Sequence, residues 1–237
     1  MNKIIEIKNL NVSFSEKKVL NNISFEINKG DIVSLIWKNG TGKSTLLKTI
    51  VGINKNFSWK IIKHYKRIWY VPQKLSFDNT IPLKVSEFFE IYHKWHNHDI
   101  SKYLEIFWAI ELLQKQVSKL SWWELQKILI VNSLLDNPEF LILDEPTAGI
   151  DSIWEETFYW IINEVQKQFP EIAILIVSHN MKMVYAHSKK IICLHQHCYC
   201  TGTPEELKNN QEFWDIFWDF VIPYKHTHDH NHTHNHE

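Results

Sequence analysis

An α/β fold, built on a mainly parallel sheet covered by helices, is predicted by three features of this 237-residue sequence. Short apolar runs of strand length alternate with segments of helical periodicity. A phosphate-binding sequence pattern lies between one apolar run and the helical segment after it, and an acidic pair closes another run about 100 residues later. Strands that alternate with helices form parallel sheets whose two faces are both covered.

Composition sets the broad class. Hydrophobic residues make up 44% and charged residues 22%, as in a globular protein with its own core. A net charge of -1 provides no attraction towards nucleic acid, so we expect no nucleic-acid partner. No apolar run approaches the roughly 18 residues of a spanning helix, and the charged start does not resemble a signal peptide. Three cysteines, an odd number, suit a reducing compartment better than a disulfide framework.

The first elements are predicted by their periodicity. Residues 5–8, 12–14 and 23–27 alternate between apolar and polar, which indicates short antiparallel strands with one solvated face. Residues 32–36 form a continuous apolar run, typical of a buried strand. A helical pattern begins near residue 44.

The later elements define the organisation of the chain. Apolar spacing is helical from about residue 81 to 135, and buried-strand runs return at 140–143 and 172–177, with a helix between them from about 153 to 169. A short helix is expected at 204–208. We therefore expect one domain at 1–220, a helical subdomain inserted at about 78–135, and a histidine-rich tail at 221–237.

The phosphate-binding pattern covers residues 37–45. Its chemistry requires backbone N–H groups that close around phosphate oxygens, a lysine that reaches the β and γ phosphates, and a hydroxyl that holds Mg²⁺. The sequence matches this pattern except at its first position, and it predicts an ATP site formed by Trp37, Lys38, Asn39, Gly40, Thr41, Gly42, Lys43, Ser44 and Thr45.

The acidic pair, Asp144-Glu145, follows four apolar residues. A carboxylate at such a strand end can direct Mg²⁺, and the adjacent glutamate is placed to polarise the attacking water. Together with the phosphate loop, this pair predicts the P-loop NTPase class, with ATP and Mg²⁺ as cofactors and ATP hydrolysis as the activity.

The chain resembles the ATP-binding subunits of ABC transporters over almost its whole length. The resemblance rests on ordered motifs at residues 37–45, 71–73, 120–126, 141–145, 148–151 and 178–179. It implies a RecA-like core sheet, an N-terminal antiparallel β subdomain and an inserted α-helical subdomain.

The same resemblance implies roles for single residues. Phe14 stacks on adenine, Gln73 joins Ser44 and Asp144 around Mg²⁺ and links that site to the membrane partner, and His179 contacts the γ-phosphate. A signature segment caps the γ-phosphate bound by the opposite subunit, and its residues are Ser121, Trp122, Trp123 and Glu124.

The implied assembly contains two copies of the chain with each ATP between them, a membrane permease, and indirectly an extracytoplasmic metal-binding protein. The chain would then sit at the cytoplasmic face of the membrane through the permease. A soluble ABC ATPase acting in translation or DNA repair is disfavoured, because there is a single phosphate loop and residues 73–121 leave no room for a long coiled coil.

Tryptophans occupy positions where the family has glycine, at Trp37, Trp69, Trp122 and Trp123. The chain has 6 glycines and 11 tryptophans, whereas roughly 17 glycines are usual at this length. Its only arginine is Arg67, which suggests AT-rich coding. UGA, one base from the glycine codon GGA, is read as tryptophan in some genetic codes and as glycine in others.

We therefore hypothesise that most of the tryptophans are glycines in the living protein. Trp59, Trp108 and Trp154 also fall in turn-like or family-glycine contexts, whereas Trp95, Trp160, Trp214 and Trp218 are not assigned. If the tryptophans in the ATP site are genuine, the alternative is a non-catalytic nucleotide-binding scaffold, because an indole there would collide with nucleotide or with the facing subunit.

The C-terminal tail indicates the transported cargo. Every second residue from 226 to 236 is histidine, and such a tract can bind Zn²⁺. The residues are His226, His228, His230, His232, His234 and His236. An expression tag is the alternative, but the interleaved residues argue against it. The cysteines and histidines of residues 193–200 could ligate metal, although an ordinary hairpin is favoured. Residues 192–206 resemble the corresponding hairpin of zinc and manganese importer ATPases, so zinc import is the leading expectation, with manganese or iron as alternatives.

Overall fold

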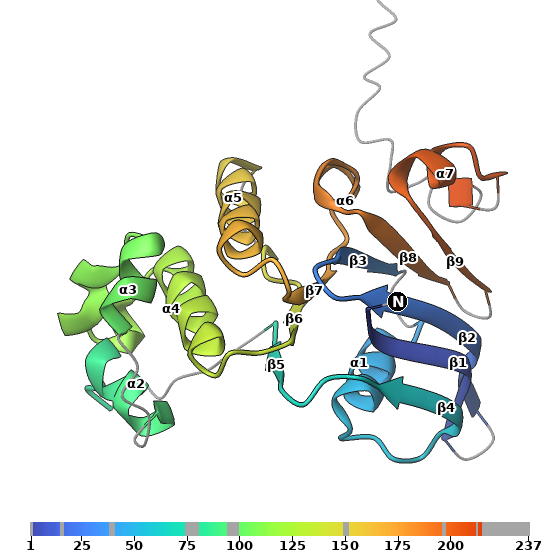
Figure 1. Cartoon of the computed structure of the whole chain (residues 1–237), viewed down its shortest axis with the longest axis horizontal. Coiled ribbons are helices and arrows are strands. Elements are labelled where there is room, and N and C mark those ends of the chain that lie inside the picture. Colours follow the sequence, from blue (N-terminus) through green and yellow to red (C-terminus); the bar gives the residue numbers. More distant parts are fainter. Residues whose placement is uncertain are drawn as a thin grey trace, which may run out of the picture.

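The computed structural model describes residues 2–14, 17–37, 41–73, 81–93, 100–148, 152–195, 198–211 and 213–214. A six-stranded sheet lies in the middle of the molecule, a three-stranded sheet lies at one end and a group of helices at the other (Figure 1). No helix within these ranges is long and apolar enough to cross a membrane.

The three-stranded sheet is antiparallel, with the order β2-β1-β4. Its strands are β1 (Lys3–Phe14), β2 (Lys17–Asn28) and β4 (Ser58–Lys63). The short strands expected at 5–8 and 12–14 form one continuous strand. Its pairing with β2 shifts in register on both sides of Leu10, next to Asn9 at φ 50°. Such irregularities absorb extra residues without ending a strand.

The six-stranded sheet has the order β5-β6-β7-β3-β8-β9. Five strands are parallel, as the sequence predicts, and the last is antiparallel to its neighbour. They are β5 (Ile68–Val71), β6 (Phe140–Asp144), β7 (Ala173–Val177), β3 (Ile32–Trp37), β8 (Lys190–His195) and β9 (Cys198–Gly202). Every residue of β3, β6 and β7 is buried, which explains their unbroken apolar runs.

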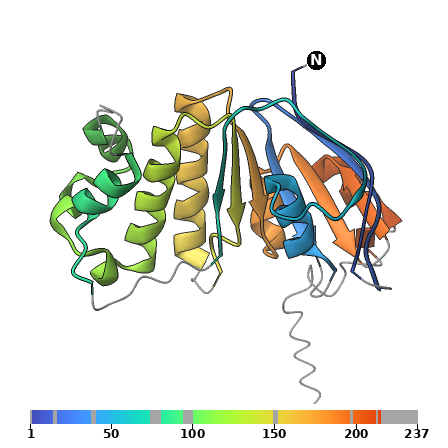
Figure 2. The ribbon, with the colours of Figure 1, turned by 90° about the horizontal axis from the view of Figure 1, so that it is seen from below.

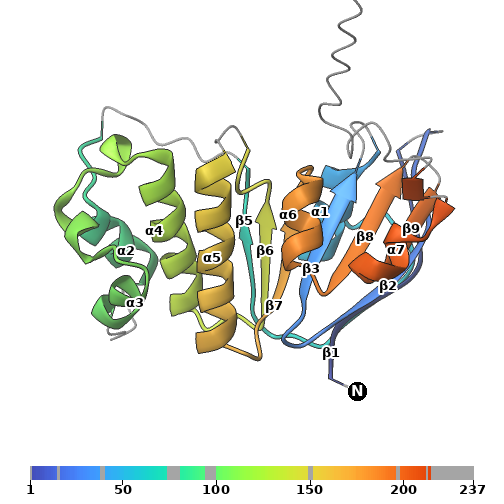
Figure 3. The same ribbon diagram turned by 90° about the horizontal axis from the view of Figure 1, so that it is seen from above.

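The helices cover both faces of this sheet. They are α1 (Lys43–Val51), α2 (Val85–His93), α3 (Ile100–Ile106), α4 (Trp122–Leu135), α5 (Ser152–Gln168), α6 (Met181–His187) and α7 (Pro204–Lys208). Two 3₁₀ turns, η1 (Ile110–Gln114) and η2 (Val117–Lys119), connect α3 to α4. Helices α4 and α5 lie side by side (Figures 2 and 3).

Side-chain alternation along β6 separates two cores. Phe140 and Ile142 pack into a core with α1 and the antiparallel sheet, whereas Leu141 and Leu143 pack into a core with α4, α5 and the other helices of that end. The phosphate-loop helix and α4 are therefore on opposite faces of the six-stranded sheet.

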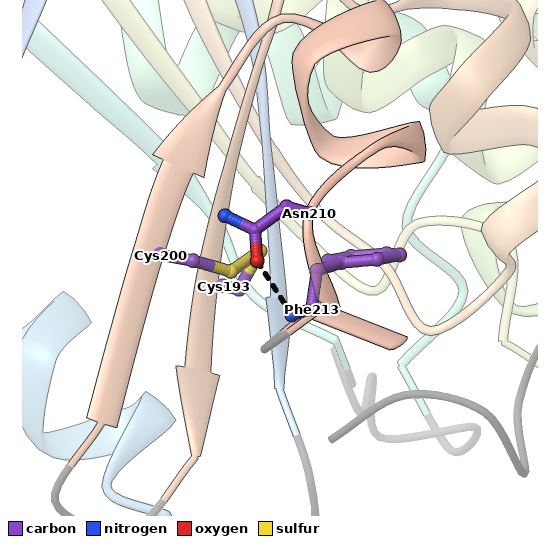
Figure 4. The surroundings of a disulfide bond; sticks show 4 residues. All are labelled: Cys193, Cys200, Asn210 and Phe213. Carbon is purple, nitrogen blue, oxygen red and sulfur yellow. Dashed lines mark hydrogen bonds between the residues drawn. A yellow bond between two sulfur atoms is a disulfide. The ribbon is translucent and has the colours of Figure 1, made fainter. Parts of the chain in front are cut away.

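The β8–β9 hairpin contains a disulfide between Cys193 and Cys200 (Figure 4). The expectation of unpaired cysteines was therefore wrong for these two. They are direct register partners whose Cα atoms are 4.9 Å apart, a separation that suits a disulfide. Beside them, Asn210 Oδ1 accepts a hydrogen bond from the Phe213 backbone N–H at 2.9 Å.

Candidate nucleotide site

The phosphate loop connects the end of β3 to the start of α1. Gly42 is the N-cap of α1 with φ 94°, and a Cβ there would lie 2.8 Å from Leu20 and 2.9 Å from Val19. Only glycine fits both the left-handed backbone and this contact with β2. No acidic residue occupies the first turn of α1, so its free N–H groups and positive dipole end suit an anion.

Lys43, the first residue of α1, reaches the carboxylates at the end of β6. Its Nζ hydrogen-bonds Glu145 Oε1 at 2.5 Å and lies 3.1 Å from Asp144 Oδ1. All three side chains are at most 13% exposed. The two sequence motifs, about 100 residues apart, thus meet in one cluster of charged side chains.

Glu145 is the centre of this cluster. Its Oε2 accepts a hydrogen bond from Gln73 Nε2 at 3.1 Å, and His179 Nδ1 lies 3.5 Å from the same oxygen. Its backbone φ is 47°, a left-handed conformation that is unusual for glutamate and that is often found at functional sites. Gln73, Glu145 and His179 follow the neighbouring strands β5, β6 and β7, whose carboxyl ends meet at this edge of the sheet.

Tyr70 is a site residue that the sequence reasoning did not single out. Its hydroxyl donates a hydrogen bond to Asp144 Oδ2 at 3.0 Å, and burial together with the Asp144 charge raises the pKa of Tyr70. Tyr70 could have been identified from its position, because it lies on β5 one residue before the Val71-Pro72-Gln73 motif. Strand β5 pairs with β6, the strand that ends in Asp144.

The signature segment begins α4. Ser121 is the N-cap, and its hydroxyl accepts from the Glu124 N–H while the Glu124 carboxylate accepts from the Ser121 N–H, which forms a capping box. Burial alone would raise the pKa of Glu124, but hydrogen bonds from Lys115 and Ser121 lower it overall. The capping box fixes the direction in which this helix start points.

The tryptophans in the predicted site occupy crowded positions. Trp37 is buried at the end of β3, and Lys43 Nζ lies 4.3 Å from the centre of its ring. Trp122 and Trp123 are the first two residues of α4, and their rings stack at 6.3 Å. The indole ring of Trp37 therefore lies against Lys43. The rings of Trp122 and Trp123 lie at the start of α4, the part of the signature that would approach phosphates.

The remaining predicted residues are placed as follows. Thr41 is buried, and Ser44 is exposed on the first turn of α1. Phe14, at the end of β1, is 47% exposed. Lys38, Asn39, Gly40 and the histidine tail lie outside the described residues. Within the described ranges, no group of three or more His, Cys, Asp or Glu side chains is arranged to hold a metal ion.

The donor atoms around the phosphate loop suit Mg²⁺. This ion prefers oxygen ligands, commonly one or two carboxylates with substrate phosphates. The Ser44 hydroxyl, the Gln73 amide and the Asp144 carboxylate are oxygen donors. Asp144 Oδ1 is buried and accepts no hydrogen bond from the described part of the chain, so it has room for another ligand besides the nearby Lys43 ammonium.

A helix N-terminus, its lysine and a strand-end carboxylate pair in direct contact define a nucleoside triphosphatase of the phosphate-loop class. Comparison with known proteins narrows this class. A sequence model described as "ABC transporter" matches residues 20–148. The zinc import ATP-binding protein ZnuC of Buchnera aphidicola subsp. Schizaphis graminum is 40% identical over 92% of this chain and 91% of its own. The protein of the same name from Photorhabdus laumondii is 39% identical over 92% and 84%.

Solved structures agree on the fold. The cbiO1 protein of Clostridium perfringens, part of an ABC transporter complex, has a TM-score of 0.79 at 23% identity and covers 92% of this chain and 95% of its own. A nucleotide-free ATP-binding cassette from an ABC transporter has a TM-score of 0.78 at 22% identity, covering 94% and 100%. The chain belongs to the ABC transporter family, as an ATP-binding subunit.

The predicted family, fold class and ATPase activity are thereby confirmed. ATP-binding subunits of this family are ATPases that use Mg²⁺, and they act in pairs with a membrane permease.

Proposed function

We propose that this ATPase powers zinc import through a membrane permease, using the cluster at the carboxyl edge of the six-stranded sheet. The observation that carries the catalytic part is the contact of Lys43 with Asp144 and Glu145. The cargo is supported by relatives that are 36–40% identical over 92% of this chain and are named zinc import ATP-binding proteins.

Binding of ATP is assigned to the start of α1. Lys43 leaves the Glu145 carboxylate and pairs with the β and γ phosphates, while the free N–H groups of α1 bind phosphate oxygens. Ser44, Gln73 and Asp144 would hold Mg²⁺, which would neutralise negative charge on the phosphates. Phe14, exposed at the end of β1, stacks on the adenine ring.

Hydrolysis is assigned to Glu145 and His179. Once Lys43 has turned to the phosphates, the Glu145 carboxylate is free to orient and polarise the attacking water. His179, which is 58% exposed and 3.5 Å from Glu145, contacts the γ-phosphate. Gln73, which donates a hydrogen bond to Glu145, is assigned the role of linking this site to the permease, as the family resemblance implies.

Two copies are needed to complete each site. The signature segment starts α4, on the opposite face of the sheet from α1, so one copy does not cap its own phosphate. In the pair, the signature of the second copy, residues 121–124, caps the γ-phosphate, which requires positions 122 and 123 to carry no indole side chain. The pair sits at the cytoplasmic face of the membrane against the permease, and an extracytoplasmic metal-binding protein delivers the cargo.

The catalytic assignment is tested with Glu145→Gln. This variant should bind ATP, stall as the closed pair and lose turnover, whereas Glu171→Gln, an exposed carboxylate before β7, should retain normal turnover. Normal turnover by Glu145→Gln would refute the assignment.

The cargo is tested by uptake of radioactive Zn²⁺, Mn²⁺ and Fe²⁺ in cells that express the chain with its permease. Zinc uptake that depends on Glu145 supports the proposal, and uptake of manganese or iron alone contradicts it.

The tail histidines 226–236 are proposed to bind Zn²⁺, which equilibrium dialysis of full-length and tail-deleted chains with ZnCl₂ would test.

A non-catalytic scaffold is the second candidate, because the Trp37 ring lies 4.3 Å from Lys43 Nζ and the stacked rings of Trp122 and Trp123 occupy the signature. Measured ATP turnover in the natively translated protein distinguishes the two: turnover supports the transporter ATPase, and ATP binding without turnover supports the scaffold.

A further inference from the structure

Trp108 has a backbone conformation that tryptophan rarely adopts. Its φ is 47°, in the left-handed region. Within the described residues, the other non-glycine residues with positive φ are three asparagines and the Glu145 of the nucleotide site, namely Asn9, Asn22, Asn137 and Glu145. Asparagine tolerates this region and active sites often hold strained residues, but a bulky residue in an ordinary loop is an outlier.

The hydrogen bonds around Trp108 explain the conformation. The Trp108 N–H donates to Glu105 O at 3.1 Å, and the Ala109 N–H donates to Leu104 O at 2.8 Å. This pair of bonds is the Schellman motif that ends α3, with Trp108 at the position normally taken by glycine. Ala109 and Leu104 are both fully buried in the same core, which is the hydrophobic contact that accompanies this motif.

The contacts of the Trp108 indole do little to offset the strain of this backbone conformation. The residue is 64% exposed, and its ring stacks on Trp160 at 4.7 Å. The backbone at 108 is therefore built for glycine, while the side chain lies mostly in water.

Two other tryptophans behave differently. Trp214 donates its Nε1–H to Lys208 O at 2.6 Å and packs edge-on against Phe213 at 5.4 Å. Trp160 lies in the interior of α5 and packs against the core formed with α4, where glycine would weaken the helix. Both positions use a tryptophan side chain, and neither has positive φ.

We propose that Trp108, together with Trp37, Trp122 and Trp123, is glycine in the protein that the cell makes, encoded by UGA codons read as glycine, whereas Trp160 and Trp214 are genuine tryptophans. The assignment of glycine at positions 37, 122 and 123 rests on the proposed function, since the backbone must approach phosphate there. Trp108 is independent of it, because it ends a helix in the helical group away from the phosphate loop.

The deciding experiment is peptide mass spectrometry of the protein purified from its native host, together with the codons of its gene. Glycine mass and UGA at 37, 108, 122 and 123, with tryptophan mass and UGG at 160 and 214, is the expected result. Tryptophan mass or UGG at 108 would overturn the proposal. This readout requires no activity, so its failure is distinct from failure of the transport function.

A stability measurement gives a second readout on protein made in a host with the standard genetic code from a synthetic gene with UGG at these positions, because UGA stops translation there. Trp108→Gly should raise the Tm by about 2–4 °C, since it removes the cost of a left-handed tryptophan. The matched control Trp214→Gly should lower the Tm, because it loses the bond to Lys208. A Tm that falls equally in both variants contradicts the assignment of position 108.

Discussion

The contact between Lys43 and Glu145 must break before phosphates can bind, and this gives a testable affinity change. Both side chains are 13% exposed, and the bond joins two charged groups. Hydrogen bonds to charged groups contribute about 1.5–3 kcal/mol. We take the lower end, about 1.5 kcal/mol, because Asp144 Oδ1 at 3.1 Å keeps Lys43 paired when Glu145 is replaced.

Glu145→Gln should therefore have two opposite effects. The nucleotide-free protein should lose roughly 1.5 kcal/mol of stability, equivalent to about 3–6 °C in Tm. Nucleotide should bind about tenfold more tightly, because Lys43 no longer has to leave the Glu145 carboxylate. The Tm is measured by scanning calorimetry and binding by isothermal titration, with Glu171→Gln as the unchanged control.

Binding of ADP separates this explanation from simple charge repulsion. Repulsion between Glu145 and the γ-phosphate would tighten only a non-hydrolysable ATP analogue. Release of Lys43 should tighten ADP as well, since the lysine also reaches the β-phosphate. Unchanged ADP affinity in Glu145→Gln would refute the reasoning.

Three further outcomes are expected. Tyr70→Phe removes a hydrogen bond to a buried carboxylate, so it should cost about 1.5–3 kcal/mol in urea denaturation and raise the Mg²⁺ concentration needed for ATP turnover; no change in either would contradict a role in positioning Asp144. Ser121→Ala removes the N-cap of α4 and should cost about 1 kcal/mol, seen as a lower Tm, with an unaltered Tm arguing against the capping box. Burial lowers the pKa of His187 below 6.5, so the unfolded chain binds a proton more readily and stability should fall as the pH drops below about 6.5. His187→Gln should flatten that slope, and an equally steep slope in the variant would exclude His187 as its source.

Sequence patterns predicted the elements that have a strong local signal, whereas β4 and α6 were not predicted. The unbroken apolar runs of β3, β6 and β7 identify buried strands, and the α4 signature carries its own capping box within four residues. Strand continuity was missed at β1, because a bulge near Asn9 changes the alternation without ending the strand.

Contacts between distant segments could be identified only from the tertiary structure. Pairing of Cys193 with Cys200 follows from hairpin register, which residue counting does not fix. The Tyr70–Asp144 bond follows from the order of strands, since β5 and β6 are sheet neighbours although about 70 residues separate them.

The sequence alone determined the phosphate loop, the acidic pair and the family, because each motif's chemistry is encoded by residue type and spacing over a few positions. Only the tertiary structure showed that Lys43 contacts Glu145, that α4, which the signature begins, packs on the opposite face of the sheet from α1, and that position 108 has a left-handed backbone. These features depend on how strands and helices pack around the sheet, and packing is a property of the whole chain.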